Sequence, residues 1–272
     1  MIDDVSDIKA MYDRDPDNED QRLERHQLEY ELTWRYLDRY LPPEGSILEI
    51  GAATGRYTLE LARRGYKVTA VDMSEVLQES CRERIVRAGL EEQVIFVLAD
   101  ARDLSPVEGE DFDAVLLMGP LYHLVLEADR ETAWREAYQR LKDGGGVIFS
   151  AFISRLGIWG DVMKKTPEMI EHQDELRSVL EQGRDVERHP DIRFRGYFAT
   201  VSEIAPLHEE LGFETLILAG VEPAISADDE SYNRLEGEQR QLWLDLFEQL
   251  STEKSIMGAS RHLLYVGTKR VK

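Results

Sequence analysis

The chain has 272 residues, enough for one large domain or two small ones with a sizeable core. Its 54 acidic and 33 basic residues give a net charge of −21, which disfavours nucleic acid as a partner, because phosphates are bound by Lys and Arg. The single cysteine excludes an intrachain disulfide, and neither an apolar run of ~20 residues nor a signal peptide is apparent. We therefore expect a cytoplasmic protein without a membrane partner.

Residues 1–44 are expected to form an acidic segment followed by one helix. The first twenty residues contain eight acids and two bases, which predicts a mobile end. An apolar repeat with helical spacing then runs from Gln21 to Pro42-Pro43 and consists of Leu23, Tyr30, Trp34, Leu37 and Leu41. The main domain is expected to begin at residue 45.

Residues 47–72 have the pattern of a βαβ unit that binds a nucleoside. The apolar run Ile-Leu-Glu-Ile is followed by a glycine loop, an amphipathic stretch that ends at Gly65, and the run Lys-Val-Thr-Ala-Val-Asp. Gly51 and Gly55 let the backbone turn sharply and approach a ligand closely. Asp72, at the tip of the second strand, can accept hydrogen bonds from two ribose hydroxyls.

The spacing of the loop argues against a nicotinamide dinucleotide. That fingerprint needs three glycines as G-x-G-x-x-G, so that a pyrophosphate meets backbone amides. Here Glu49 precedes a G-x-x-x-G loop, and its carboxylate would repel a pyrophosphate but can order a loop that receives an ammonium group. The pattern E-x-G-x-x-x-G with Asp72 resembles motif I of the class I S-adenosylmethionine (SAM)-dependent methyltransferases, with Ala53 in place of the family's middle glycine.

Three later segments extend the resemblance in the family's order. Residues 94–101 resemble the third strand with an acid at its end, residues 111–118 a fourth and nearly continuous apolar strand, and residues 141–150 a glycine turn and fifth strand. Residues 261–267 resemble the final antiparallel strand. The resemblance implies an α/β fold, Rossmann-like, with a seven-stranded, mostly parallel sheet, helices on both faces, and helical lid insertions.

The resemblance also implies a cofactor, SAM, with S-adenosylhomocysteine as its product. Glu49, Gly51 and Ala53 would border the methionine moiety, Asp72 the ribose, and Met73, Asp100 and Ala101 the adenine. Met118, Gly119 and Leu121 would line the passage to the methyl group. Ala52 and Gly55 complete the loop. Tyr30, like Tyr12, either reaches the cofactor from a covering helix or packs on the core.

The sequence that follows the fourth strand, residues 118–124, favours a small-molecule acceptor. Met118 and Gly119 replace the polar residues of the [DN]-P-P-[YFW] motif in enzymes that methylate an amine on a nucleic-acid base. A Pro-Cys nucleophile and the acid of metal-dependent catechol enzymes are also missing there, and no cluster has metal-ligand spacing, so we expect no metal. The segment Gly-Pro-Leu-Tyr-His-Leu resembles that of small-molecule methyltransferases.

Two residues are candidates for the catalytic side of the site. His123 either accepts a proton from the nucleophile or anchors its loop by a hydrogen bond. Tyr197 either stacks on the substrate or belongs to the core, and the same holds for Phe198. His262 and Cys81 are interpreted as structural residues.

Two insertions are expected, at residues 152–197 and 220–260. The first should contain a helix from Thr166-Pro167-Glu168 to Gly183 that forms a lid over the carboxyl end of the sheet. Leu235, Leu242, Leu246 and Leu250 should form one face of a helix in the second, which either caps the site or contacts another subunit. Four arginines near residue 190 and a histidine either form a solvated surface or bind a substrate carboxylate: Arg184, Arg188, His189, Arg193 and Arg195.

Together these features predict transfer of the methyl group of SAM to a small molecule by in-line displacement, in which alignment is the main requirement. Two alternatives remain from the sequence alone. Some relatives of the fold transfer the aminocarboxypropyl arm of SAM or cyclise it, and others hold SAM without turnover. The oligomeric state is not predicted.

Overall fold

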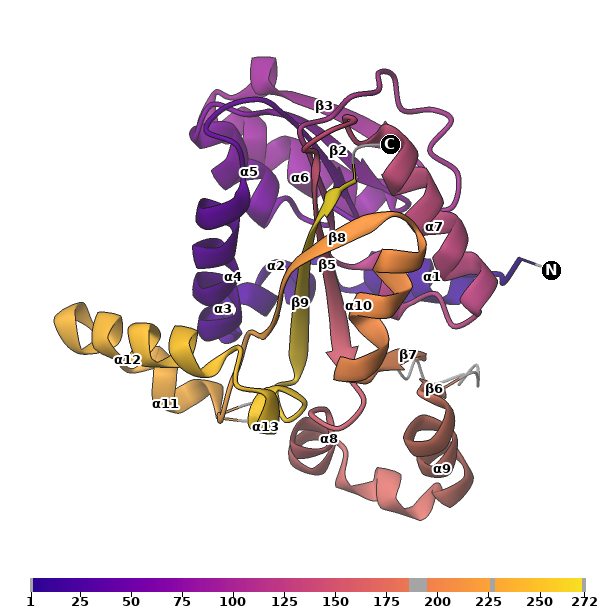
Figure 1. Cartoon of the computed structure of the whole chain (residues 1–272), viewed down its shortest axis with the longest axis vertical. Helices are drawn as coiled ribbons and strands as arrows, with labels where there is room; N and C mark the ends of the chain where they lie inside the picture. The colour runs from indigo at the N-terminus through magenta and orange to yellow at the C-terminus, as the bar shows by residue number, and fades with distance from the viewer. Residues whose placement is uncertain (1, 186–194, 226–227, 271–272) are drawn as a thin grey trace.

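A computed structural model describes residues 2–185, 195–225 and 228–270 of the chain. One sheet dominates it, with strands in the order β3-β2-β1-β4-β5-β7-β6 and with β9 paired to both β5 and β8 (Figure 1). The strands are β1 (Ser46–Ile50), β2 (Lys67–Asp72), β3 (Val94–Leu98), β4 (Ala114–Leu117), β5 (Val147–Ser154), β6 (Arg184–Asp185), β7 (Gly196–Ala199), β8 (Phe213–Gly220) and β9 (His262–Lys269).

Helices precede the first strand and connect the later ones. The α-helices are α1 (Ser6–Arg14), α2 (Pro16–Asp20), α3 (Arg22–Arg25), α4 (Gln27–Tyr40), α5 (Arg56–Arg63), α6 (Glu75–Ala88), α7 (Glu127–Arg140), α8 (Trp159–Lys165), α9 (Gln173–Gln182), α10 (Val201–Glu210), α11 (Asp229–Asn233), α12 (Gly237–Leu250) and α13 (Lys254–Met257). The 3₁₀ turns are η1 (Glu91–Gln93), η2 (Pro120–Tyr122) and η3 (Pro167–Glu171).

The sheet is mostly parallel, as predicted, and the final strand is antiparallel to both of its neighbours. It contains nine strands, whereas the sequence predicts seven. The additional strands are β6 and β7, which pair with each other over two residues each. The sequence analysis had predicted β6 as part of the lid insertion and β7 as the lead-in to the following helix. Strands this short carry too few residues to show an alternating pattern.

Both faces of the sheet are buried, which explains the continuous apolar runs of its strands. Alternate residues of one strand point to opposite sides, so Ile47 joins the core under α4, α5 and α6, and its neighbour Leu48 joins the core under α7 and α10. Trp134 and Phe149 are among the largest fully buried side chains of the two cores. Figure 1 shows the helices on either side of the sheet.

The prediction of a mobile N-terminal end is wrong. Residues 6–25 form α1, α2 and α3, which lie against the domain and bury Ile8 and Leu23. Their acids are bound by arginines from distant segments: Arg195 binds Asp3 and Asp7, and Arg84 binds Asp20. Because arginines distant in the sequence neutralise these acids, the acids do not repel one another as strongly as the composition of the segment suggests.

The two predicted insertions are helical, but their details differ from the prediction. In the first, η3 and α9 are separated at His172, and Gly183 ends α9 in the left-handed conformation, as expected. In the second, α12 contacts α4 and buries Leu244 and Phe247. Of the predicted face, Leu235 and Leu250 pack against the same core, whereas Leu242 and Leu246 are exposed, so the predicted face is only partly the buried one. None of the helices in the described part of the chain has the length and apolar character needed to cross a bilayer.

A buried histidine under α10 makes the stability depend on pH. His208 is fully buried, donates from Nδ1 to the carbonyl of Ile204 and accepts at Nε2 from the Ser150 hydroxyl, and burial lowers its pKa to about 3. The unfolded chain binds a proton there below its ordinary pKa, so stability should fall as the pH drops from 6.5. We expect His208→Gln to reduce this loss by about 1.4 kcal/mol per pH unit in urea unfolding between pH 5 and 6.5. Equal slopes for both proteins would contradict the assignment.

Candidate functional site

The loop between β1 and α5 forms a cradle that requires its glycines. Gly51 has φ +82°, and a Cβ there would lie 2.7 Å from Cδ of Pro120, so no other residue fits without displacement. Ala53 also has a positive φ, of 49°, which is the conformation that the family's middle glycine adopts at little cost. The amides of Gly51 and Ala52 both donate to the carbonyl of Val71, which fixes the loop to β2.

Asp72 lies at the end of β2 and faces this loop. One carboxylate oxygen accepts the amide of Ala53 at 2.8 Å, and the other accepts the amide of Ser74 at 2.8 Å. Its pKa is raised by burial, against which these amides act. A carboxylate has about four acceptor positions, so the two amides do not use up its capacity for a ligand.

Glu49 lies beside the same loop and is buried. The hydroxyl of Thr58 donates to it at 2.6 Å, and burial raises the pKa of Glu49 to about 8. Desolvation disfavours the charged carboxylate there, and a nearby ammonium group would restore it. Thr58 is a contact that the sequence analysis missed, because a threonine within a helix carries no motif.

These residues line one cavity at the carboxyl ends of β1, β2 and β4. Of the predicted site residues, the lining includes Glu49, Gly51, Ala52, Ala53, Asp72, Met73, Asp100, Ala101, Met118, Gly119 and His123. Asp100 lines it with a carboxylate that Arg102 already binds at 2.6 Å. Thus, residues from four separate segments of the sequence line one concave site.

Four predicted site residues lie outside this lining. Gly55 is the left-handed N-cap of α5, where a Cβ would collide with Sγ of Cys81, so its role is conformational. Leu121 is fully buried in the core. Tyr30 packs against Trp34 of its own helix, α4, and against Tyr57 of α5.

Tyr197 is the fourth and is separated from the cavity. The guanidinium of Arg130 lies 3.6 Å from the centre of its ring, and both residues line a different cavity, formed by α7, α9 and α10. Burial raises the pKa of Tyr197 to about 12. The core interpretation therefore fits Tyr197, and its assignment as an acceptor-side residue is corrected.

The N-terminal helices cover the cavity. The predicted covering helix was expected from Gln21 onward, and its beginning, α3, contributes Arg22 and Leu23 to the lining, whereas the rest of it, α4, contributes none. The helices α1 and α2 add Ile8, Lys9, Tyr12 and Glu19. The sequence analysis read α1 and α2 as mobile because of their charge, although the apolar residue Ile8 was an available signal.

His123 is held by one of these helices. The Tyr12 hydroxyl and Nε2 of His123 share a hydrogen bond of 2.7 Å, and the rings meet edge to face. Burial, with Arg195 and Arg22, lowers the pKa of His123 to about 3, while burial raises that of Tyr12. A neutral imidazole whose Nε2 is already engaged anchors its loop and is a poor base. Of the two interpretations of His123, the geometry favours the one in which it anchors its loop by a hydrogen bond over the one in which it accepts a proton from the nucleophile.

A second cavity of about 490 Å³ adjoins the first. The two share Tyr12, Glu19, Arg22 and Tyr122 in their walls. The remaining wall comes from the N-terminal segment, the first insertion, β5, β7, and the start of β9 with the residue before it. It includes Asn18, Arg25, His26, Ile153, Ile158, Trp159, Val162, Met169, Leu176, Val179, Phe198, Arg261 and His262. The insertion thus lies over the carboxyl end of β5, where a lid was predicted.

The predicted arginine group does not form a free anion site in the described residues. Arg188, His189 and Arg193 lie outside the residues that the structure describes. Arg184 is exposed and binds Gln182, and Arg195 is buried with Asp3 and Asp7 around it. Arg195 therefore fastens the N-terminal helices rather than a substrate carboxylate.

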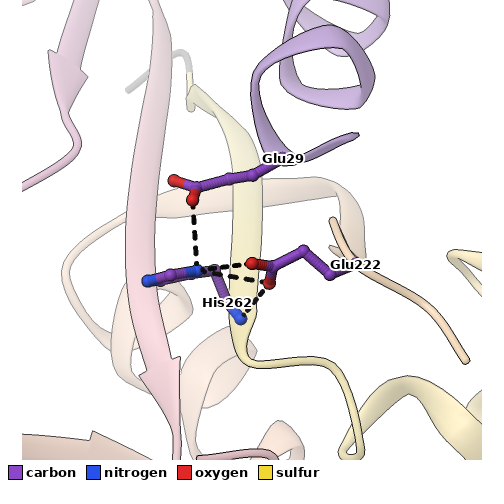
Figure 2. Close-up of side chains that lie close together, drawn as sticks. All are labelled: Glu29, Glu222 and His262. Atoms are coloured by element: carbon purple, nitrogen blue, oxygen red, sulfur yellow. Dashed lines mark hydrogen bonds and ion pairs between the residues drawn. The ribbon is translucent and has the colours of Figure 1, made fainter. Parts of the chain in front are cut away.

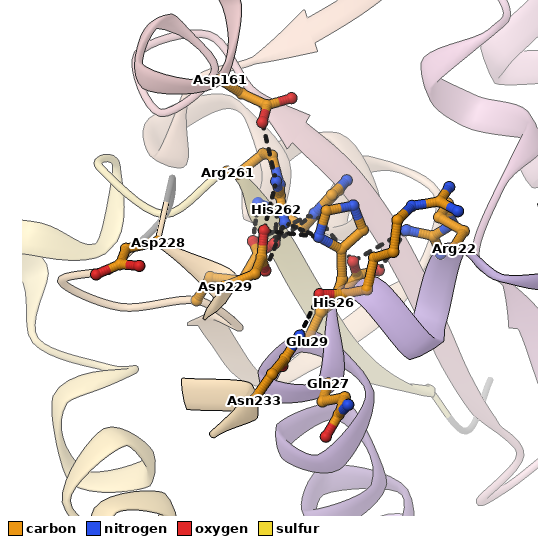
Figure 3. Close-up of polar contacts among 12 residues, drawn as sticks. Arg22, His26, Gln27, Glu29, Asp161, Asp228, Asp229, Asn233, Arg261 and His262 are labelled. Atoms are coloured by element: carbon orange, nitrogen blue, oxygen red, sulfur yellow. Dashed lines mark hydrogen bonds and ion pairs between the residues drawn. The ribbon is translucent and has the colours of Figure 1, made fainter. Parts of the chain in front are cut away.

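A buried group of acids and histidines borders the second cavity. Glu29, Glu222 and His262 have side-chain atoms within 4.8 Å of one another, close enough to hold a metal ion (Figure 2). Arg22 binds both oxygens of Glu29 at 2.9 Å, and Arg261 binds Glu222 at 2.5 Å. Two guanidinium groups would repel a cation at this place. We therefore describe the group as part of an ion-pair network, which Figure 3 shows extending to His26, Asp161 and Asp229.

Cys81 lies behind the loop and is fully buried. Burial and the neighbouring Glu49 raise the pKa of its thiol to about 12. Because the thiolate is the reactive form, we expect the folded protein to react with Ellman's reagent at about pH 8 at least ~100-fold more slowly than glutathione does. In urea the same chain should release one thiol at the glutathione rate. Fast reaction of the folded protein would show that the helix opens readily.

Comparison with known proteins agrees with this geometry. A family model described as a methyltransferase domain matches residues 47–145, which include the loop, Asp72, Asp100 and the segment after β4. Residues 47–145 therefore belong to a methyltransferase domain. The resemblance found in the sequence is thereby confirmed, together with the fold class.

Individual relatives of this methyltransferase domain cover part or most of the chain. Carboxy-S-adenosyl-L-methionine synthase of Shewanella loihica is 33% identical over 119 residues, 42% of this chain and 47% of the relative. The chain spans about half the length of the curated relatives it matches.

Two solved structures cover nearly the whole chain. A 1,6-didemethyltoxoflavin-N1-methyltransferase of Burkholderia thailandensis, solved with its substrate and S-adenosylhomocysteine, has a TM-score of 0.63 at 14% identity and covers 98% of this chain and 88% of its own. A SAM-dependent methyltransferase of Methanosarcina mazei has a TM-score of 0.60 at 18% identity and covers 87% and 98%. At such identities the likeness concerns the fold.

Proposed function

We propose that this protein binds SAM in the first cavity and transfers its methyl group to a small molecule in the second. The observation that carries the proposal is the convergence of Glu49, the Gly51 loop and Asp72 on one cavity that shares a wall with another cavity. The family match over residues 47–145 supports the identity of the cofactor.

The residues of the first cavity fit the parts of SAM. Asp72 would accept hydrogen bonds from the ribose hydroxyls at its remaining acceptor positions, and Glu49 offers a carboxylate whose charge an ammonium group would stabilise. Met73 and Ala101 would border the adenine, and Met118 and Gly119 the passage to the acceptor. When bound, SAM supplies a methyl group on a positive sulfur, already activated for displacement.

The chain's own contribution to the reaction is then chiefly alignment and exclusion of water. The helices α1–α3 cover the first cavity, and the insertion α8–α9 walls the second, so that a nucleophile would meet the cofactor away from bulk water. Orientation of this kind can supply roughly 7–11 kcal/mol of the barrier.

The name of one relative favours a second candidate function. Carboxy-S-adenosyl-L-methionine synthase, by its name, makes a modified form of SAM, and the sequence analysis had left non-methylating SAM chemistry open. The similarity to this relative does not separate the two candidates, because methyl transfer and non-methylating SAM chemistry would both need the SAM-binding motifs of the first cavity.

The test is incubation of the purified protein with SAM labelled in its methyl group and an extract of cell metabolites, followed by mass spectrometry. Methyl transfer predicts a labelled small molecule and an equal amount of S-adenosylhomocysteine. Release of methylthioadenosine, or a SAM derivative of higher mass, would replace methylation by the second candidate. Bound but unchanged SAM would favour a non-catalytic role.

A further inference from the structure

The second cavity contains a histidine whose surroundings differ from those of His123. His262 begins β9, opposite Ile153 of β5, and both residues line the cavity. Its Nδ1 lies 3.1 and 3.2 Å from the oxygens of Glu222 and 3.4 Å from Glu29. Figure 2 shows the other ring nitrogen pointing away from both carboxylates.

The carboxylates fix the tautomer of this imidazole. A carboxylate accepts and does not donate, so Nδ1 carries the proton and Nε2 keeps its lone pair. Within the described ranges no hydrogen bond reaches Nε2, so that lone pair is left for a ligand. An imidazole oriented in this way by a buried acid is the arrangement of a general base.

Glu222 is itself held in place. It is 1% exposed, and it accepts the backbone amide of His262 at 2.7 Å and the guanidinium of Arg261. The charged groups that face this pair come from every neighbouring element: Arg22 and His26 from the N-terminal helices, Glu29 from α4, Asp161 from α8, Asp229 from α11, and Arg261 from the residue before β9 (Figure 3).

The wall of the cavity indicates the chemical class of its ligand. Four aromatic side chains and several aliphatic ones line it, and the indole N–H of Trp159 is buried with no partner in the part of the chain that is described. Its four cationic and four acidic side chains balance. The cations also have partners of their own: Arg22 binds Glu29, Arg261 binds Glu222, and Lys165 binds Asp161. An uncharged, largely aromatic molecule fits this wall better than an anion.

We propose that His262 is the general base for the acceptor, and that the acceptor is an uncharged aromatic molecule whose nucleophilic oxygen or nitrogen carries a proton. The proposal rests on the proposed function of the first cavity. The acceptor's lone pair forms the bond to the methyl carbon, the bond from that carbon to sulfur breaks, and its electron pair stays on sulfur. The acceptor's proton passes to Nε2 of His262, and Glu222 and Glu29 stabilise the resulting imidazolium.

Binding of a simple probe tests the site without turnover. In protein labelled with ¹⁵N-histidine and saturated with S-adenosylhomocysteine, Nε2 of His262 should give the signal of an unprotonated nitrogen. Addition of 2-naphthol should shift it, and should leave His172, which lies in the insertion outside the cavity lining, unchanged. Calorimetry should show that 2-naphthol binds about 5-fold or more tightly than naphthalene, and that His262→Gln abolishes this difference. If neither compound binds, or if both bind equally to the wild-type protein, the proposal is wrong.

Turnover gives the second test once the labelling experiment has supplied an acceptor. His262→Gln should lower kcat by about 100-fold or more and remove the acid limb of its pH profile, and His172→Gln should change neither. Glu222→Gln should shift that limb, because it removes one carboxylate from Nδ1. An unchanged kcat in His262→Gln, with methylation intact, would overturn the proposal and leave the proposed function standing. Failure of S-adenosylhomocysteine to bind would instead refute the proposed function.

Discussion

Replacement of Asp72 with alanine is expected to weaken the binding of SAM by about 10- to 100-fold, which corresponds to roughly 1.4–2.8 kcal/mol. The carboxylate is buried at the tip of β2, and its two oxygens already accept the amides of Ala53 and Ser74. Its remaining acceptor positions are the ones we assign to the ribose hydroxyls. Isothermal titration calorimetry with SAM and with S-adenosylhomocysteine measures the change directly.

Two further variants make this result interpretable. Glu75→Ala removes an exposed acid three residues away that does not line the cavity, and its affinity should stay within about 2-fold of the wild type. Asp72→Asn keeps the shape of the side chain and removes its charge, so it should bind SAM with an affinity between those of the wild type and Asp72→Ala. It takes the place of the alanine variant in the test if that variant folds poorly. Full affinity in both Asp72 variants would exclude the ribose role.

The second large effect concerns Arg261, whose removal should cost about 3–5 kcal/mol of the free energy of unfolding. Its side chain is 3% exposed, and its guanidinium contacts Glu222, Asp161 and Asp229. In Arg261→Ala, the carboxylate of Glu222 would stay buried without its main charge partner. Urea unfolding at neutral pH, followed by circular dichroism, measures the loss.

An exposed arginine provides the control for Arg261. Arg234 is 74% exposed and pairs with Glu230 on the same helical face, so Arg234→Ala should change stability by about 0.5 kcal/mol or less. Arg261→Lys keeps the charge but loses the forked contact, and we expect a loss between the two. A loss below about 1 kcal/mol in Arg261→Ala would mean that water or a rearrangement replaces its contacts.

Local patterns in the sequence were sufficient to predict the centre of the fold and the first cavity. The strands are apolar on both faces because helices cover both, as Ile47 and Leu48 illustrate, and this leaves a continuous apolar run. Gly51 and Asp72 lie within one βαβ unit, so the spacing that brings them together is short. The helical part of the first insertion also has local start and stop signals: Thr166-Pro167 at its beginning and Gly183 at its end.

Features that depend on pairs distant in the sequence were not predicted. The N-terminal helices are held by Arg195, which lies 192 residues away from Asp3 in the sequence, and composition alone suggested that they were mobile. His262 was read as structural because Glu222 and Glu29 approach it only in the folded protein. The buried face of α12 was predicted only in part, because Leu250 packs on the core together with Leu244 and Phe247, whereas Leu242 is exposed.

The central claim is that the cavity above β1 and β2 accommodates SAM. Its most direct test is calorimetric titration of the purified, ligand-stripped protein with S-adenosylhomocysteine. We expect a saturable heat with one molecule bound per chain and a rise in melting temperature on addition of the same compound. No heat and no thermal shift, from a protein that circular dichroism shows to be folded, would contradict the claim.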